Sequence, residues 1–149
     1  MSDKSVVVID TQALLDWLVF RDASAAPWSA AVQAGHLRWR SCPRMRTELA
    51  HMLGHPRLSR WNPQSEQALA VFDRYAELVD DPVATQPALR CRDPDDQVFI
   101  DLALAQRAGW LLTRDKALLA LARRARPLGT TILRPDAWAT ATAAAAASP

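Results

Sequence analysis

The chain has 149 residues, of which 50% are hydrophobic, and carries 18 basic and 16 acidic residues for a net charge of +2. This length allows one sizeable core and leaves little for a second domain, and the small net charge neither requires nor excludes a nucleic-acid partner. Two distant cysteines, Cys42 and Cys91, lack the paired spacing of a zinc site, so we expect free thiols in a reducing cytoplasm.

The first half of the chain predicts two strands, each followed by helical segments. The β-branched run Val6–Ile9 is typical of a strand buried on both faces of a sheet. The next elements are predicted at 11–20 (helix), 22–35 (helix) and 37–42 (strand). Pro43 favours the first turn of a further helix, which we expect to end near Leu53, before Gly54. The N-terminal apolar stretch lacks a basic segment and is interrupted by acids, so neither a signal peptide nor a membrane span fits.

The second half continues the alternation of strands and helices. Helical spacing runs from Pro63 to Val79, where acidic residues and a proline end it. The remaining elements are predicted at 83–92 (a weak strand), 96–108 (helix, ended by Gly109), 110–113 (strand), 115–124 (helix) and 131–133 (strand). This pattern predicts one α/β domain over residues 1–138 with a mainly parallel sheet. The Ala-rich tail, 139–149, is expected to be either a frayed helix or disordered.

Four carboxylates fall where such a sheet would have its ligand-binding edge. Asp10 and Asp115 each follow an apolar strand, whereas Glu48 and Asp96 lie near the starts of predicted helices. The carboxyl ends of strands and the N-termini of helices share one edge in a βαβ chain, and open sheets bind ligands there. Four acids at one edge would repel one another unless they were protonated or joined by a divalent cation. The pattern therefore indicates metal-dependent chemistry.

Three of these acids also have a purely structural interpretation. Asp10 and Asp115 are placed to cap the helices that follow them. Glu48 lies four residues after Arg44 and could form an ordinary surface ion pair with it. Because two acids occupy equivalent positions after two strands, a shared site remains the preferred interpretation. Thr113 and Arg114 precede Asp115 and could add polar contacts.

Asp96 is chosen over its acidic neighbours because of the helical stripe on which it lies. The stripe continues through Phe99 and Ile100, so Asp96 faces the sheet, where an unpaired acid is costly. Asp95 is the nearest competitor, and Asp93 is assigned to helix capping. Two further acids, Asp16 and Asp101, are expected on solvated helix faces.

Arginine supplies 16 of the 18 basic residues, leaving only Lys4 and Lys116. Arginine suits bidentate phosphate contacts, and several arginines cluster between residues 38 and 60, which fits a surface that faces RNA. The base composition of an arginine-favouring genome explains the same bias at least as well.

The stretches around the acids resemble, in order, the motifs of PIN domains. The run VVVIDTQALL from Val6 resembles the opening strand of that family, with Gln12 where Asn is common. Residues 46–58, 93–105 and 109–119 are similar to its second, third and fourth acidic motifs, and residues 131–138 are similar to its closing strand. The resemblance spans residues 5–138 and is closest to the toxin components of toxin–antitoxin systems, the VapC-like ribonucleases.

The resemblance implies a three-layer α/β/α sandwich and Mg²⁺- or Mn²⁺-dependent cleavage of RNA in the cytoplasm. The implied metal-binding and catalytic residues are Asp10, Glu48, Asp96 and Asp115. The supporting residues would be Thr11, Gln12, Thr113 and Asp95, and the RNA-binding residues Arg44, Arg46 and Arg114. A homodimer and a small antitoxin partner are also implied.

Two other functions remain open. A non-catalytic RNA- or protein-binding module is supported mainly by Gln12. A metal-dependent phosphohydrolase acting on small substrates ranks last, because the chain has neither an Asp-x-Asp-x-Thr motif nor a P-loop.

Overall fold

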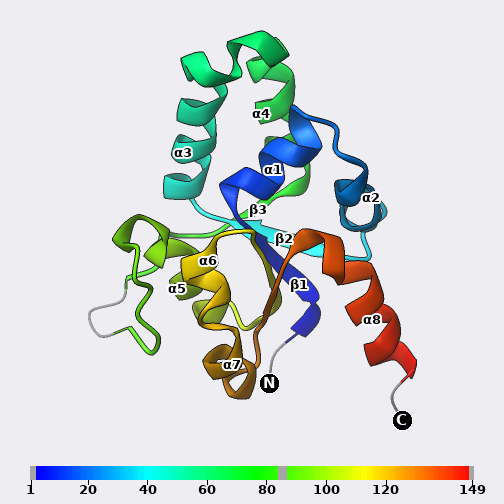
Figure 1. Ribbon diagram of the computed structural model, residues 1–149, viewed down its shortest axis with the longest axis vertical. Helices are drawn as coiled ribbons and strands as arrows, with labels where there is room; N and C mark the ends of the chain where they lie inside the picture. Colours follow the sequence, from blue (N-terminus) through cyan, green and yellow to red (C-terminus); the bar gives the residue numbers. More distant parts are fainter. Residues whose placement is uncertain (1–2, 84–86, 148–149) are drawn as a thin grey trace.

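The computed structural model describes residues 3–83 and 87–147. Its central sheet has five strands in the order β3-β2-β1-β4-β5, and every neighbouring pair is parallel. The strands are β1 (Asp3–Ile9), β2 (Arg38–Ser41), β3 (Glu77–Leu78), β4 (Ala108–Leu112) and β5 (Thr131–Leu133). The helices are α1 (Thr11–Leu18), α2 (Ala26–Gln33), α3 (Pro43–Leu53), α4 (Ser65–Tyr75), α5 (Gln97–Ala105), α6 (Lys116–Leu119), α7 (Ala122–Ala125) and α8 (Trp138–Ala147). The predicted α/β class is confirmed (Figure 1).

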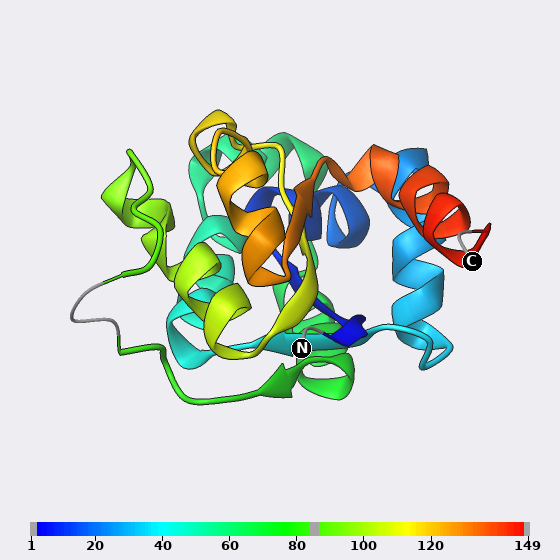
Figure 2. The same cartoon turned by 90° about the horizontal axis from the view of Figure 1, so that it is seen from below.

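Different helices cover the two faces of the sheet, which gives three layers (Figure 2). On one face, Val7 and Ile9 of β1 pack in a core formed with α1, α2, α3, α4 and α8. On the other face, Val6 and Val8 pack in a second core with α5, α6 and α7. These four β1 side chains are at most 1% exposed, and full burial of such a side chain contributes about 1.5–3 kcal/mol. The prediction that this strand is buried on both faces is therefore confirmed.

The strand β3 lies where a helix was predicted. Helix α4 ends at Tyr75, and β3 forms at Glu77–Leu78, although helical spacing continues to Val79. The Val79 N–H donates to the Ser41 carbonyl at 2.9 Å, so hydrogen bonding to β2 prevails over the apolar period. The weak strand predicted at 83–92 is wrong for residues 83 and 87–92, which form no strand. Residues 84–86 of that prediction lie outside the described residues.

Gly109 lies inside β4 and does not end the preceding helix. A Cβ at Gly109 would lie 2.6 Å from the Lys4 Cα and 2.7 Å from the Asp3 carbonyl oxygen, so β1 and β4 approach too closely for a side chain. Helix α5 instead ends at Ala105, and Arg107 turns the chain with a φ of 52°. The predicted helix end at residue 108 was therefore wrong.

The Ala-rich tail is helical over its described residues. Helix α8 begins at Trp138, which is buried, and Ala141 packs against the same core. The helix lies beside α2 (Figure 2). Among the residues that the structure describes, no helix is both long and apolar enough to cross a membrane.

Candidate active site

The four predicted acids line one cavity at the carboxyl edge of the sheet. Asp10 directly follows β1, Asp115 follows β4, Asp96 precedes α5, and Glu48 lies within α3. The cavity has a volume of about 500 Å³. Its other lining residues are Thr11, Gln12, Leu15, Met52, Phe99, Arg114 and Arg134. Elements that are distant in the sequence thus bring the four acids together as the topology predicted.

Asp10 both caps helix α1, as its structural interpretation predicted, and lines the acidic cavity. Its side chain is buried, and one oxygen accepts the Ala13 N–H at 2.9 Å, which caps α1. The other oxygen accepts the hydroxyl of Thr113. Burial raises the pKa of Asp10 despite these hydrogen bonds. An acid held in this way keeps a fixed orientation at the edge of the cavity.

Asp115 also caps a helix, since it accepts the Leu118 N–H at 3.1 Å. Its own N–H donates to the Thr113 hydroxyl at 2.9 Å, so Thr113 links Asp10 to the backbone of Asp115. On its other side Asp115 is hydrogen-bonded to Asp96. Burial, followed by this hydrogen bond and the charge of Asp115, raises the pKa of Asp96 to about 7.

Glu48 is half-buried, and desolvation raises its pKa. A hydrogen bond with Thr11 lowers the pKa, whereas the nearby charge of Asp10 raises it. The alternative ion pair with Arg44 is absent from the ion pairs of the described residues. Glu48 is therefore part of the acidic cavity and not of a surface ion pair.

Asp93 has the predicted capping role, since its side chain accepts the Asp95 N–H at 3.0 Å, and it also belongs to a group of three close acids. Carboxylate oxygens of Asp93, Asp96 and Asp115 lie within 4.8 Å of one another. Residues Pro94–Asp96 form a 3₁₀ helix, in which residues three apart lie on the same side, so Asp93 joins Asp96. The sequence predicted only the capping role of Asp93, although residues three apart share a face in an α-helix as well. Asp95 lies outside the lining of this cavity and lines a neighbouring hollow.

Asp16 is buried, which corrects the prediction of a solvated position. Its side chain is 6% exposed and accepts a hydrogen bond from Arg114 Nη2 at 2.8 Å. Burial raises its pKa, while the Arg114 charge and a hydrogen bond with Gln12 lower it. Asp101 is half-buried and accepts the Gln97 amide at 2.9 Å, away from the cavity.

The predicted arginines divide into different environments. Arg114 lines the cavity, whereas Arg46 forms a bidentate pair with Asp73 at 2.8 and 2.9 Å and does not line it. Arg44 lines two neighbouring hollows. Arg134 lines the cavity but was not predicted. The signal that could have identified Arg134 is its position immediately after β5, the same place that Asp10 occupies after β1.

The donor set of the cavity fits a hard divalent cation. Its ionisable donors are carboxylates, the ligand type that Mg²⁺ and Mn²⁺ prefer. Burial and the neighbouring acidic groups together raise the pKa of Asp96, and a bound cation would stabilise its ionised form. Asp93, Asp96 and Asp115 are close enough to share one ion.

Two comparisons with known proteins bear on this arrangement. A family model described as PIN domain matches residues 6–117, which include all four predicted acids. The fold is similar to that in the crystal structure of VapBC2 from Rickettsia felis bound to a DNA fragment from their promoter. The TM-score is 0.56 at 12% sequence identity, over 87% of this chain and 98% of the other. At that identity the likeness shows the fold alone. No curated protein matches the sequence.

Proposed function

This chain belongs to the PIN domain family, and we propose that it is a metal-dependent ribonuclease that hydrolyses RNA phosphodiester bonds. The observation that carries the proposal is that acids from α3, from the start of α5 and from the ends of β1 and β4 line one cavity. Among the residues that the structure describes, no serine, cysteine or histidine lines that cavity, so we assign the chemistry to its carboxylates. We assign the activity to residues 1–138 and place it in the cytoplasm.

The acids of the cavity would have different roles in the reaction. Asp96 and Asp115, together with Asp93, would hold a Mg²⁺ or Mn²⁺ ion, and Asp10 would complete the ligand set. Such an ion lowers the pKa of water and neutralises charge on a phosphate. Glu48 would orient the attacking water or accept its proton, because a raised pKa makes its carboxylate a stronger base near neutral pH.

The remaining lining residues would position the RNA. Arg134 and Arg114 place guanidinium groups at the cavity, where they can bind phosphate oxygens in a bidentate manner. Arg114 is already held by Asp16, so its orientation is fixed before RNA binds. Leu15, Met52 and Phe99 give the cavity an apolar side, which strengthens the electrostatic interactions within it.

We further propose that the chain is the toxin of a toxin–antitoxin pair. The support is the order of its motifs and its similarity in fold to VapBC2. A small antitoxin would bind the chain and cover the cavity, and the toxin would form a homodimer. Co-expression with the product of an adjacent small reading frame should give a stable complex without RNA cleavage. The isolated chain should have the mass of a dimer in light scattering.

One observation favours a second function, a non-catalytic RNA- or protein-binding module. The Gln12 side chain is hydrogen-bonded to Asp16 and thus turned to an acid outside the four-acid group. If Gln12 cannot take over the role of the usual Asn, wild-type protein would bind RNA and never cut it in the presence of Mn²⁺.

The test is cleavage of a mixed RNA pool by wild type, Asp10→Asn and Asp80→Asn, with and without Mn²⁺. Asparagine can still cap α1, so Asp10→Asn should fold normally and lose more than about a hundredfold in activity. Asp80 is exposed and does not line the cavity, so its variant controls for the loss of one charge. Full activity of Asp10→Asn would contradict the proposal.

A further inference from the structure

Three hollows follow one another on the surface, beginning at the acidic cavity. The second hollow has a volume of about 630 Å³ and shares Glu48 with the cavity. The third has a volume of about 660 Å³ and shares Arg44 and Val98 with the second. Because neighbouring hollows share lining residues, they lie side by side, from the acids, past the start of α3, to the loop that precedes α5.

The far end of this path is rich in unpaired arginine. Arg44, Arg90 and Arg92 line the third hollow and are exposed; we call them the arginine patch. Within residues 3–83 and 87–147, none of their guanidinium groups has an ion-pair or hydrogen-bond partner. Arg46, by contrast, is occupied by Asp73. The three free guanidinium groups are thus available to an anionic ligand.

The backbone beneath the patch is held in place by Gln97. The side chain of Gln97 donates to the Leu89 carbonyl at 2.8 Å and accepts the Cys91 N–H at 2.7 Å. Leu89 and Cys91 are buried, and the alternating residues Arg90 and Arg92 are exposed. A backbone fixed in this way leaves only the two arginine side chains to be ordered on binding.

We propose that the arginine patch binds the phosphates of the RNA strand on one side of the scissile bond. The proposal rests on the ribonuclease function proposed above and adds the route of the substrate. The acidic cavity repels a polyanion, and a net charge of +2 attracts one weakly, so phosphates beyond the reacting one need their own cations. The hollows extend from Glu48 at the acidic cavity to the arginine patch, so one RNA strand can contact the acids and the patch together.

The first test measures RNA binding without cleavage. A labelled single-stranded RNA is titrated in EDTA by fluorescence anisotropy, at several salt concentrations, against wild type and Arg90→Gln/Arg92→Gln. Loss of two phosphate contacts should weaken binding about tenfold and reduce the salt slope by about 1.4. The matched control is Arg123→Gln/Arg124→Gln, two exposed neighbours on α7 that line none of the three hollows. Equally weakened RNA binding in both double variants would contradict the proposal that the arginine patch binds RNA.

The second test separates the patch from the ribonuclease function. With Mn²⁺, the patch variant should cleave RNA with a raised KM and an unchanged kcat, and its circular dichroism should match wild type. If wild type cleaves RNA and the patch variant binds and cleaves equally well, the patch is refuted while the ribonuclease function stands. If the variant loses RNA binding but wild type never cleaves, the patch is supported and the ribonuclease function fails. If the variant loses binding to poly-glutamate and retains RNA binding, the patch serves an acidic protein instead, and the proposal is wrong.

Discussion

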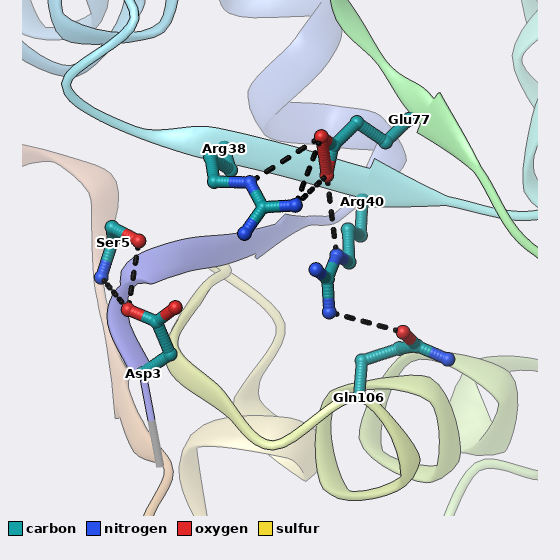
Figure 3. A network of polar contacts seen from close by, with 6 residues as sticks. All are labelled: Asp3, Ser5, Arg38, Arg40, Glu77 and Gln106. Atoms are coloured by element: carbon teal, nitrogen blue, oxygen red, sulfur yellow. Dashed lines mark hydrogen bonds and ion pairs between the residues drawn. The ribbon is translucent and has the colours of Figure 1, made fainter.

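The two ends of the sheet use the same residue types in opposite ways. Near the amino ends of the strands, the acids are paired with hydrogen-bond donors (Figure 3). Glu77 lies 3.3 Å from Arg38 and 3.2 Å from Arg40. Asp3 accepts hydrogen bonds from the hydroxyl and N–H of Ser5, which lower its pKa. These charges satisfy one another and fix β3 against β2.

At the carboxyl ends, acids lie close to other acids. Burial is the first cause of the raised pKa values of Asp10, Glu48 and Asp96, and the charges of neighbouring acids add to it. The amino-end pairs are exposed and contribute little to stability, whereas the carboxyl-end group destabilises the protein when ionised. The amino-end acids are therefore matched by groups of the chain itself, whereas the carboxyl-end acids fit a ligand that the described residues do not supply.

The largest expected effect on stability is at the amino end and is steric. Gly109→Ala places a Cβ within 2.7 Å of β1 backbone atoms, so β1 must move and the sheet is strained. We expect the free energy of unfolding, measured in urea, to fall by about 3 kcal/mol. Gly54→Ala is the matched control, because its Cβ would meet no atom closer than 3.8 Å. Equal stability of the two variants would show that β1 and β4 do not approach as described.

A smaller loss is expected at the carboxyl end when Asp16 loses its partner. Arg114→Met leaves a buried carboxylate without its cation, and the free energy of unfolding should fall by about 2 kcal/mol at pH 8. This figure is reduced because the Arg114 side chain is 36% exposed. The loss should shrink at pH 5, since Asp16 can then bind a proton. An equal loss at both pH values would mean that packing, and not charge, explains it.

The free energy of unfolding is expected to rise when one acid of the site is neutralised. The folded-state pKa of Asp96 is raised from 3.8 to about 7, so its contribution to stability is present below about pH 4 and is lost as the pH rises through 7. In a chelator at pH 8, Asp96→Asn should be about 1–2 kcal/mol more stable than wild type, a figure reduced for solvent screening. The difference should vanish near pH 4. Lower stability of the variant at pH 8 would contradict burial and the neighbouring acidic charges as the causes of the raised pKa.

The sequence predicts the residues at the carboxyl ends of the strands better than those at the amino ends of the strands. Asp10 and Asp115 follow strands, and strand periodicity together with parallel topology brings strand ends together. The capping role of Asp93 was predicted, but its place beside Asp115 was not, because Asp115 comes from a distant element. Asp16 was assigned to solvent because its partner, Arg114, comes from a distant element, and such a contact leaves no trace in local periodicity.

Prediction failed at the amino end of the sheet where the structure depends on contacts between segments that are distant in the sequence. The two residues of β3 lie between Ala76 and Val79, which continue the apolar period of α4, and only contact with β2 makes them a strand. Gly109 was interpreted as a helix terminator, whereas its role comes from the close approach of β1. Both errors arise where tertiary contacts override local propensity.

The smallest expected effect tests whether the amino-end pairs are dispensable. Arg38→Gln removes one exposed partner of Glu77, which retains Arg40. The free energy of unfolding should therefore change by less than about 0.5 kcal/mol. Arg40→Gln should cost about 1 kcal/mol, because Arg40 is 21% exposed and also donates to Gln106 at 3.2 Å. RNA cleavage should be unchanged in both variants, since neither arginine lines the cavity. If Arg38→Gln reduced cleavage while leaving stability intact, the amino end would take part in function, and the division between the two ends would be wrong.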